Sequence, residues 1–288
     1  MKLALGTAQI GLPYGITNHH GQIDIDEARR IIFTARDNDI DMLDTAINYG
    51  DSQERLGEIG VSEFKIVSKL PSISSNSNVT NWVNNNIHKS LKKLMASSLY
   101  GLLLHRPKEL LGRNGKELWA SLEMLKNEGF IQKLGISIYS PNELEKIVEV
   151  YDIDIVQAPF NIFDRRMEVS GWFQRLHDMD IEIHVRSIFL QGLLLMPVNH
   201  VPKKFNQWMN YFNLWHAFLE KNNLSPQSAC ISFIRSKPMI DRIVIGVDKS
   251  SQLVELLSDF NGTKNEQVSV PNLSCNDEDF INPVNWNM

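Results

Sequence analysis

Apolar residues along the chain form two alternating patterns. Short, nearly continuous apolar runs are typical of buried parallel strands. Longer segments with an apolar residue every three or four positions are typical of helices packed on one face. The strands predicted from these runs are 3–6, 41–45, 65–70, 99–105, 133–138, 153–160, 181–189 and 242–247. The predicted helices start at 24, 51 and 140 or span 79–97, 115–128, 168–179, 206–222, 226–236 and 250–259.

Eight strands alternating with helices within 288 residues favour a closed α/β architecture, the (β/α)8 barrel, as a single domain. An open doubly wound sheet is the alternative. That fold usually carries a glycine-rich phosphate turn after its first strand, and no GxGxxG motif occurs here. The segment from about 261 onward is polar and lacks periodicity, so we predict an irregular tail.

Capping residues support several of the predicted helix starts. Asp24 precedes the first amphipathic segment, with Glu27 three positions later. Ser140 is followed by a proline and by Glu143, which is a capping-box arrangement, and Ser225 is also followed by a proline. These residues predict that helices begin there.

Composition narrows the possible partners and location. A net charge of -5, with 22% charged and 43% hydrophobic residues, argues against nucleic-acid or membrane-surface binding. The longest apolar run, Ile188 to Met196, is shorter than the roughly 20 residues that span a bilayer. Cys230 and Cys275 are distant from each other and suit neither a disulfide framework nor a zinc cluster, so we expect a cytoplasmic protein without a metal. No pattern predicts an oligomeric state.

Four side chains with acid–base chemistry stand at or just beyond the ends of consecutive predicted strands. Asp44 ends the second strand and Tyr49 follows in the next loop, whereas Lys69 and His105 end the third and fourth strands. In a barrel these ends share one rim, where barrel enzymes carry out their chemistry. We therefore predict that the four side chains form a catalytic group.

This group would suit protonation of a substrate oxygen. An ammonium beside a phenol lowers the phenol pKa from its usual value near 10. Lys69 could do this to Tyr49 while Asp44 holds the ammonium in place. Each residue also has a structural interpretation: a turn cap for Asp44, a buried ring for Tyr49, a solvent-reaching side chain for Lys69 and a packing histidine for His105. Their joint occurrence favours catalysis.

These residues resemble the aldo-keto reductase family over about residues 1–260. The matching motifs are Gly6-Thr7, Leu43-Asp44-Thr45-Ala46 with Tyr49-Gly50, Ser68-Lys69, Leu104-His105-Arg106-Pro107, Gly135-Ile136-Ser137, Gln157 with Asn161, Gln191-Gly192-Leu193 and Ile245-Gly246. The resemblance implies a (β/α)8 barrel that reduces a small aldehyde or ketone with NADPH or NADH. It implies Tyr49 as the proton donor, Lys69 and Asp44 as its tuning pair and His105 as the residue that orients the substrate. The opening pattern from Gly6 to Gly15 is similar to bacterial members found with surface-polysaccharide genes, which points to a sugar-like substrate.

The resemblance also assigns a set of cofactor-binding residues. They are Gly6, Thr7, Ser137, Gln157, Arg186, Ser187, Phe189, Gln191, Gly192, Gly246, Lys249, Ser250, Gln252 and Glu255. Ser137 and Gln157 match the pair that holds the nicotinamide amide in the family. Residues 187–192 match the segment that wraps the pyrophosphate, where glycine lets backbone amides approach the phosphates.

Some positions depart from the family pattern. Ile138 stands where an asparagine usually follows the serine, and Arg186 stands where an aromatic residue often stacks on the nicotinamide. A guanidinium plane can still stack on a ring. After the eighth strand Asp248 would repel the 2′-phosphate of NADPH, whereas Lys249 and Ser250 would attract it. Asp248 and Ser250 could equally be helix caps, and the family favours NADPH with NADH as the alternative.

Two other classes of function are considered. The departures at Ile138 and Arg186 would suit a barrel that binds the cofactor as a sensor or scaffold with little turnover. A metal-dependent barrel hydrolase or lyase is disfavoured, because no HxH or HExxH spacing occurs.

Overall fold

The computed structural model describes residues 1–16, 18, 21–73, 78–262 and 270–286. Eight parallel strands close into a barrel in sequence order, with β1 pairing to β8. The strands are β1 Lys2–Gly6, β2 Met42–Asp44, β3 Lys65–Leu70, β4 Leu99–Leu104, β5 Ile131–Ser137, β6 Ile155–Pro159, β7 Glu182–Arg186 and β8 Arg242–Ile245. This confirms the predicted (β/α)8 fold.

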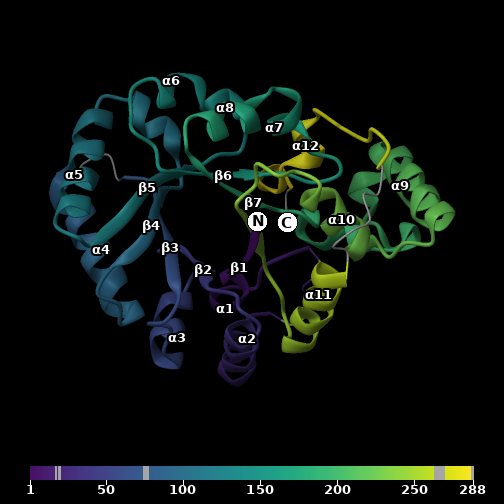
Figure 1. Cartoon of the computed structure of the whole chain (residues 1–288), viewed down its shortest axis with the longest axis horizontal. Helices are drawn as coiled ribbons and strands as arrows, with labels where there is room; N and C mark the ends of the chain where they lie inside the picture. Colours follow the sequence, from purple (N-terminus) through teal and green to yellow (C-terminus); the bar gives the residue numbers. More distant parts are fainter. Residues whose placement is uncertain (17, 19–20, 74–77, 263–269, 287–288) are drawn as a thin grey trace.

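Helices surround the barrel (Figure 1). The α-helices are α1 Ala8–Gly11, α2 Ile25–Asp37, α3 Ser52–Ile59, α4 Val79–Leu94, α5 Gly115–Asn127, α6 Glu145–Val148, α7 Arg166–Val169, α8 Trp172–Asp178, α9 Met209–Asn222, α10 Pro226–Arg235, α11 Ser250–Gly262 and α12 Glu278–Ile281. The 3-10 helices are η1 Pro107–Leu111, η2 Pro141–Glu143, η3 Leu190–Leu195, η4 Val198–His200, η5 Lys203–Trp208 and η6 Pro283–Asn285.

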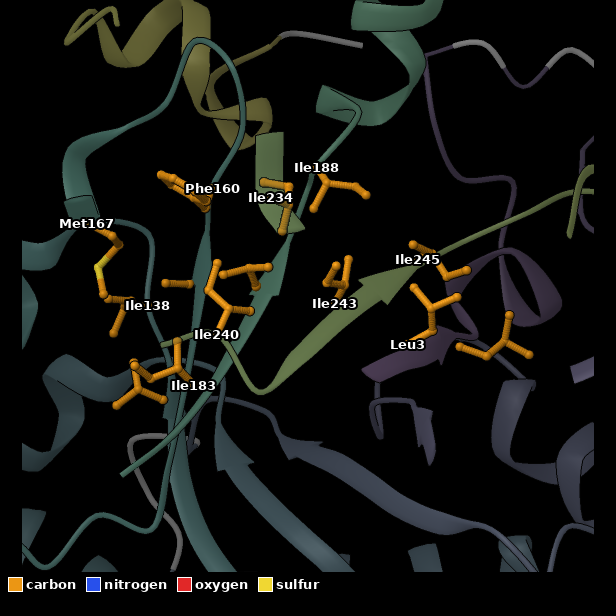
Figure 2. Packing of buried hydrophobic residues seen from close by; sticks show 14 of the residues in the cluster. Leu3, Ile138, Phe160, Met167, Ile183, Ile188, Ile234, Ile240, Ile243 and Ile245 are labelled. Carbon is orange, nitrogen blue, oxygen red and sulfur yellow. The ribbon is translucent and has the colours of Figure 1, made fainter. Parts of the chain in front are cut away.

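Two hydrophobic clusters stabilise the barrel. The small one fills its interior and consists of Ala4, Met42, Val67, Leu103 and Ile155. The large one lies between the strands and the helices, and Figure 2 shows part of it around β1, β7 and β8. Because side chains alternate along a strand, residues two apart on one strand share a side of the barrel wall. The outward-packed Ile183 and Val185 therefore leave Glu182, His184 and Arg186 of β7 pointing inward.

The structure bears out most predicted helix starts. The Asp24 side chain accepts a hydrogen bond from the Glu27 amide, and Ser225 caps α10 in the same way. Ser140 and Glu143 form the predicted capping box. One helix differs: the segment predicted as 168–179 is divided into α7 and α8 by Gly171, whose φ of 75° is left-handed.

The predicted irregular tail is confirmed only in part: residues 270–276 form no helix or strand, but the described tail also contains α12 and η6. Helix α11 continues to Gly262, residues 263–269 lie outside the described ranges, and the chain then packs against the barrel. Phe280 of α12 is fully buried and Trp286 is 5% exposed. The Cys275 amide donates to the carbonyl of Phe163 at 2.8 Å. Two isolated aromatic residues among polar ones give no periodic pattern, so the sequence did not reveal this packing.

The tail also contacts aromatic side chains of η5 and α9. The Phe280 ring stacks on Trp208 at 5.1 Å between centroids and lies 5.6 Å from both Tyr211 and Phe212. Trp208 donates its indole N–H to Asp277 at 2.9 Å. These aromatic side chains therefore pack on the chain's own tail.

Candidate active site

Three consecutive strands bring ionisable side chains to one end of the barrel. Asp44 ends β2, Lys69 is the last residue but one of β3, and His105 directly follows β4. Tyr49 lies in the turn between β2 and α3. Its ring centroid is 5.2 Å from Nζ of Lys69 and 6.1 Å from the centroid of the His105 ring. The structure thus gathers the four predicted catalytic side chains.

Lys69 and Asp44 form a buried ion pair. Lys69 is 1% exposed and Asp44 is 4% exposed. Nζ of Lys69 donates to Oδ1 of Asp44 at 2.5 Å and to the carbonyl of Thr45 at 3.0 Å. Burial lowers the pKa of Lys69, and the Asp44 carboxylate opposes that effect. Lys69 therefore does not reach solvent, and the structural interpretation of an exposed lysine is wrong.

Asp44 also anchors the amide side chain expected to contact the cofactor. Nε2 of Gln157 donates to Oδ2 of Asp44 at 2.7 Å, and Oγ of Ser137 donates to Oε1 of Gln157 at 3.3 Å. Both side chains are buried. One hydrogen-bonded chain therefore connects the ends of β5, β6, β2 and β3, and the Asp44 carboxylate binds partners on two sides.

A glycine pair fixes the turn that carries Tyr49. A Cβ on Gly11 would lie 1.9 Å from the carbonyl oxygen of Tyr49, and one on Gly50 would lie 2.1 Å from the carbonyl oxygen of Gly11. The two segments can approach this closely only without side chains. Oγ of Ser52 reinforces the contact by donating to the carbonyl of Thr7 at 3.0 Å. The Tyr49 turn is thereby held against α1.

The ionisation of Tyr49 differs from the expectation. Burial and then the Asp44 carboxylate raise the pKa of Tyr49 above its usual value, and Arg186 lowers it only in part. The Lys69 ammonium, 5.2 Å from the ring centroid, does not bring this pKa below its usual value, because burial and the Asp44 carboxylate outweigh it. Tyr49 therefore holds its proton at neutral pH, and its hydroxyl has no hydrogen-bond partner among the described residues.

His105 is neutral in this setting. Burial, with the positive charges of Lys69 and Arg186, lowers the pKa of His105 to about 3. A neutral imidazole has one N–H donor and one acceptor nitrogen. Neither ring nitrogen has a hydrogen-bond partner within the described parts of the chain, so the ring can bind an incoming oxygen.

We expect His105→Asn to flatten the acid dependence of stability. The unfolded chain binds a proton on histidine near pH 6.5, whereas the folded chain resists it down to a pKa of about 3. Wild-type stability is therefore fully present above the unfolded value and falls as the pH drops below it, by up to about 1.4 kcal/mol per pH unit from this group.

Urea unfolding of wild type and His105→Asn, from about pH 7 to about pH 4, measures this difference. The exposed His88 of α4 provides a matched control as His88→Asn. If the free energy of unfolding depended on pH in the same way for wild type and His105→Asn, the inference that folded His105 is neutral would be contradicted.

A cavity of about 360 Å³ extends from Tyr49 along the ends of β7 and β8 to the start of α11. This volume is in the range of small-molecule sites. Of the predicted site residues, its lining includes Gly6, Thr7, Asp44, Tyr49, Arg186, Ser187, Phe189, Gln191, Gly192, Gly246, Gln252 and Glu255. The cavity therefore joins the proton-donor region to the loops predicted to bind a dinucleotide.

Other predicted cofactor residues lie elsewhere. Ser137 and Gln157 are buried beneath the cavity in their bonds to Asp44. Lys249 is exposed and Ser250 is half-buried, and neither lines the cavity. Thr7 borders the cavity, but its hydroxyl is buried and donates to the carbonyl of Asp44 at 3.1 Å. The polar groups of Thr7, Ser137 and Gln157 therefore bond to the protein itself, and Lys249 and Ser250 lie outside the cavity lining.

The loop after β7 has an unusual backbone. Ser187, Leu190 and Gln191 have φ values of 59°, 48° and 54°, and Gly192 has 90°. Left-handed conformations at non-glycine residues cost about 1 kcal/mol or more each and cluster at functional sites. Phe189, with a φ of -104°, directly precedes the left-handed run 190–192. Such a change from right- to left-handed backbone turns successive amides toward one point, which suits an anion.

The start of α11 is already in contact with acceptor side chains. Oε1 of Gln252 accepts from the amides of Asp248 and Lys249 at 2.8 and 3.2 Å. The Ser250 amide donates to the carboxylate of Glu27 from α2. Burial raises the pKa of Glu27, but hydrogen bonds from Ser250 and Arg30 outweigh it and keep that pKa below its usual value. An ionised carboxylate therefore lies where Lys249 and Ser250 were expected to attract a phosphate.

Sequence reasoning missed several residues of this site. Gln9, Tyr14 and Gln227 line the cavity, and the Tyr14 hydroxyl accepts from Nε2 of Gln191 at 3.4 Å. A Cβ on Gly246 would lie 2.5 Å from the side-chain nitrogen of Gln9. Gln9 and Tyr14 lie within the opening pattern from Gly6 to Gly15, which was compared with the family but not assigned to the site, and no pattern indicated Gln227.

The sequence profile of the Aldo/keto reductase family matches residues 2–269. The chain belongs to the aldo/keto reductase family. The oxidoreductase YqkF of Bacillus subtilis is 26% identical over 192 residues, which cover 62% of this chain and 60% of YqkF. The aldo-keto reductase YhdN of the same organism is 24% identical over 294 aligned positions, covering 91% and 85%. The holo structure of aldo-keto reductase AKR11C1 from Bacillus halodurans has a TM-score of 0.72 at 17% identity, covering 94% of this chain and 89% of that one.

The family match confirms the resemblance predicted from the sequence, and the solved structure has the same fold. The aldo/keto reductase chain spans 60% of the length of YqkF. Across the described ranges, no group of three or more His, Cys, Asp or Glu side chains could hold a metal ion. The same ranges contain no helix both long and apolar enough to cross a bilayer.

Proposed function

We propose that this aldo/keto reductase reduces the aldehyde or ketone group of a small molecule, with Tyr49 delivering the proton. The observation that carries the proposal is the free, protonated Tyr49 hydroxyl beside the Lys69–Asp44 pair, at one end of a cavity. The far end of that cavity is built from the β7 loop and α11. The Gly6-to-Gly15 pattern leads us to propose a sugar-like substrate. The two distant cysteines, which suit no disulfide framework, lead us to propose a cytoplasmic location.

Cofactor binding is supported by the shape and backbone of the cavity. Reduced nicotinamide supplies a hydride when it is bound. The left-handed residues Ser187 and 190–192 give a backbone that suits a pyrophosphate, and Gly6 and Gly246 keep the cavity open at the ends of β1 and β8. Ser137 and Gln157 keep unused hydrogen-bonding capacity beside their present bonds, since the Gln157 amide has a second N–H and the Ser137 hydroxyl can still accept.

The protein residues stabilise and protonate the substrate oxygen. A carbonyl oxygen bound between Tyr49 and neutral His105 accepts hydrogen bonds that strengthen as the carbonyl carbon gains the hydride and the oxygen becomes an alkoxide. The alkoxide is more basic than a phenol, so the Tyr49 proton transfers to it even with a raised pKa. The Lys69–Asp44 pair places a positive charge beneath the Tyr49 ring, which favours the phenolate left behind. The product is an alcohol.

The test is oxidation of NADH and NADPH, followed by ultraviolet absorbance, with a panel of aldehydes and ketones. We expect consumption of the reduced cofactor to match alcohol formation. Cofactor binding without turnover across the whole panel would instead support the sensor or scaffold function. Absence of cofactor binding would contradict both.

For the cofactor itself, the structure leads us to propose NADH in preference to the NADPH favoured by the family. If the nicotinamide reaches Tyr49, the adenosine end lies at the far end of the cavity, near Asp248, Gln252 and Glu255. The ionised Glu27 on the Ser250 amide adds a negative charge there. A 2′-phosphate would be repelled by it.

We expect Glu27→Gln to improve NADPH binding relative to NADH by about fivefold, equivalent to roughly 1 kcal/mol. Fluorescence titration of both cofactors measures the ratio of dissociation constants. Asp26→Asn removes one charge from an exposed position of the same helix and serves as the control. Equal effects of the two variants, or an unchanged ratio, would contradict the assignment.

A further inference from the structure

Arg186 presents unused hydrogen-bond donors to the cavity. Its Nη2 donates to the carbonyl of Ile138 at 3.0 Å and its Nη1 donates to Oγ of Ser187 at 3.3 Å. These bonds engage two of the five N–H groups of a guanidinium. Within the described ranges the other three have no acceptor, although the side chain is half-buried and lines the cavity beside Tyr49.

Arg186 also has no counter-ion. Arg242 is buried and paired with Asp41, and half-buried Arg166 is paired with Asp164 at 2.8 Å. Buried Arg165 has no carboxylate partner among the described residues, but it donates to the carbonyls of Ile162 and Pro271. No carboxylate among the described residues lies within 4.0 Å of the Arg186 nitrogens, and nearby Asp44 is bonded to Lys69 and Gln157. Partly desolvated charges are normally paired, so an anion from outside the chain would complete this site.

The position of the guanidinium indicates which ligand supplies that anion. It lies over the Tyr139 ring, 4.7 Å from the centroid, at the β5 side of the barrel mouth. Its charge lowers the pKa of Tyr49 and of His105, so it acts where the substrate carbonyl is expected. The pyrophosphate is expected farther along, at residues 187–192. A guanidinium stacked on the nicotinamide would repel the positively charged oxidised ring.

Resting on the proposed reductase function, we propose that Arg186 binds an anionic group of the substrate, so that the enzyme prefers carbonyl compounds carrying a carboxylate or a phosphate near the carbonyl. The guanidinium presents parallel N–H groups that match both oxyanions in bidentate geometry. Its bonds to Ile138 and Ser187 hold it in place before the substrate arrives.

Matched substrate pairs test this preference. Pyruvate with methyl pyruvate, and succinic semialdehyde with its methyl ester, differ in the charge of the acid group and otherwise by one methyl group. Glyceraldehyde 3-phosphate with glyceraldehyde tests phosphate as the source of the anion. The neutral ester of pyruvate has the more electrophilic carbonyl, so a preference for pyruvate must come from binding. We expect kcat/KM to favour the acidic member of at least one pair by about tenfold or more, the gain of one well-formed charged contact.

The measured quantity for the variants is the ratio of acidic to neutral kcat/KM. Arg186→Met should lower this ratio about tenfold or more. Arg186→Lys keeps the charge but loses the paired N–H groups of the guanidinium, so its ratio should lie between those of wild type and Arg186→Met. Arg106→Met removes an exposed charge next to His105 and should leave the ratio nearly unchanged. Circular dichroism and Tm establish that each variant is folded.

The proposal would be overturned if Arg186→Met lowered kcat/KM equally for the acidic and the neutral member of every pair. It would also be overturned if the wild-type enzyme did not prefer the acidic members. If Arg106→Met lowered the ratio as much as Arg186→Met, the preference would come from the overall positive potential at this end of the barrel. That result would also overturn the proposal. If the wild-type enzyme reduces none of these compounds, the anion site is tested by calorimetric titration of wild type and Arg186→Met with lactate in the presence of cofactor. Binding lost in Arg186→Met would support the anion site although the reductase function had failed, and binding absent or unchanged would exclude it.

Discussion

Tyr49→Phe is expected to lower kcat for aldehyde reduction by about 10²- to 10⁴-fold, the usual contribution of a positioned proton donor. The phenylalanine ring keeps the packing of Tyr49 against Lys69 and His105. Because the hydroxyl has no partner among the described residues, we expect Tm and cofactor binding to change little. Steady-state kinetics with an aldehyde, together with cofactor titration, separate a loss of chemistry from a loss of binding.

Tyr14→Phe is the matched comparison, because Tyr14 is another phenol that lines the same cavity. Burial raises the pKa of Tyr14 as well, but its hydroxyl accepts from Gln191, and Tyr14 lies between α1 and α2 rather than beside the Lys69–Asp44 pair. We expect a smaller effect, mainly on KM. A large fall in kcat for Tyr14→Phe with near-normal Tyr49→Phe would reassign the proton donor to Tyr14.

The raised pKa of Tyr49 has a consequence for the pH profile. The sequence-based expectation of a depressed pKa predicts that reduction slows once the phenol ionises near neutral pH. In the structure the pKa of Tyr49 is raised, so the donor form persists as the pH increases. We therefore expect no loss of kcat from this group between about pH 6 and about pH 9, below the usual phenol pKa of about 10.

The strand ends were predictable because periodicity and polarity change at the same residues. Asp44, Lys69 and His105 each follow an apolar run, and in a parallel barrel such positions must meet at one rim. Their pairing was only partly predictable. That Lys69 bonds Asp44 follows from charge, but whether it still influences Tyr49 depends on burial and on the direction of the ammonium, which sequence alone does not determine.

Contacts between distant segments account for what sequence reasoning missed. Glu27 was expected to complete a cap on its own helix, yet its carboxylate binds the Ser250 amide across 223 positions of sequence. Phe280 packs on α9 through a segment without periodicity. Arg186 was recognised as a departure from the family, but its missing counter-ion becomes evident only when the neighbouring carboxylates are placed. These are properties of tertiary structure and leave no local pattern.

Lys69→Met is expected to lower the free energy of unfolding by roughly 3–5 kcal/mol, the cost of leaving one member of a buried ion pair alone. Lys69 is 1% exposed and its pair with Asp44 measures 2.5 Å. Removal of the ammonium leaves the Asp44 carboxylate with only the Gln157 amide as its side-chain donor. Urea unfolding at neutral pH measures the loss, and kcat should fall as well, because the charge beneath Tyr49 is gone.

The double variant Lys69→Met/Asp44→Asn separates stability from chemistry. It removes both charges, and the asparagine oxygen can still accept from Gln157, so no unpaired ion remains in the barrel. Replacing a whole buried pair costs far less than breaking it, and we expect recovery of more than half of the lost stability. Activity should not recover, because Tyr49 still lacks the ammonium. If the double variant is as unstable as Lys69→Met, the pair is not the source of the loss. If activity returns with stability, Lys69 acts only through folding and has no part in the reaction.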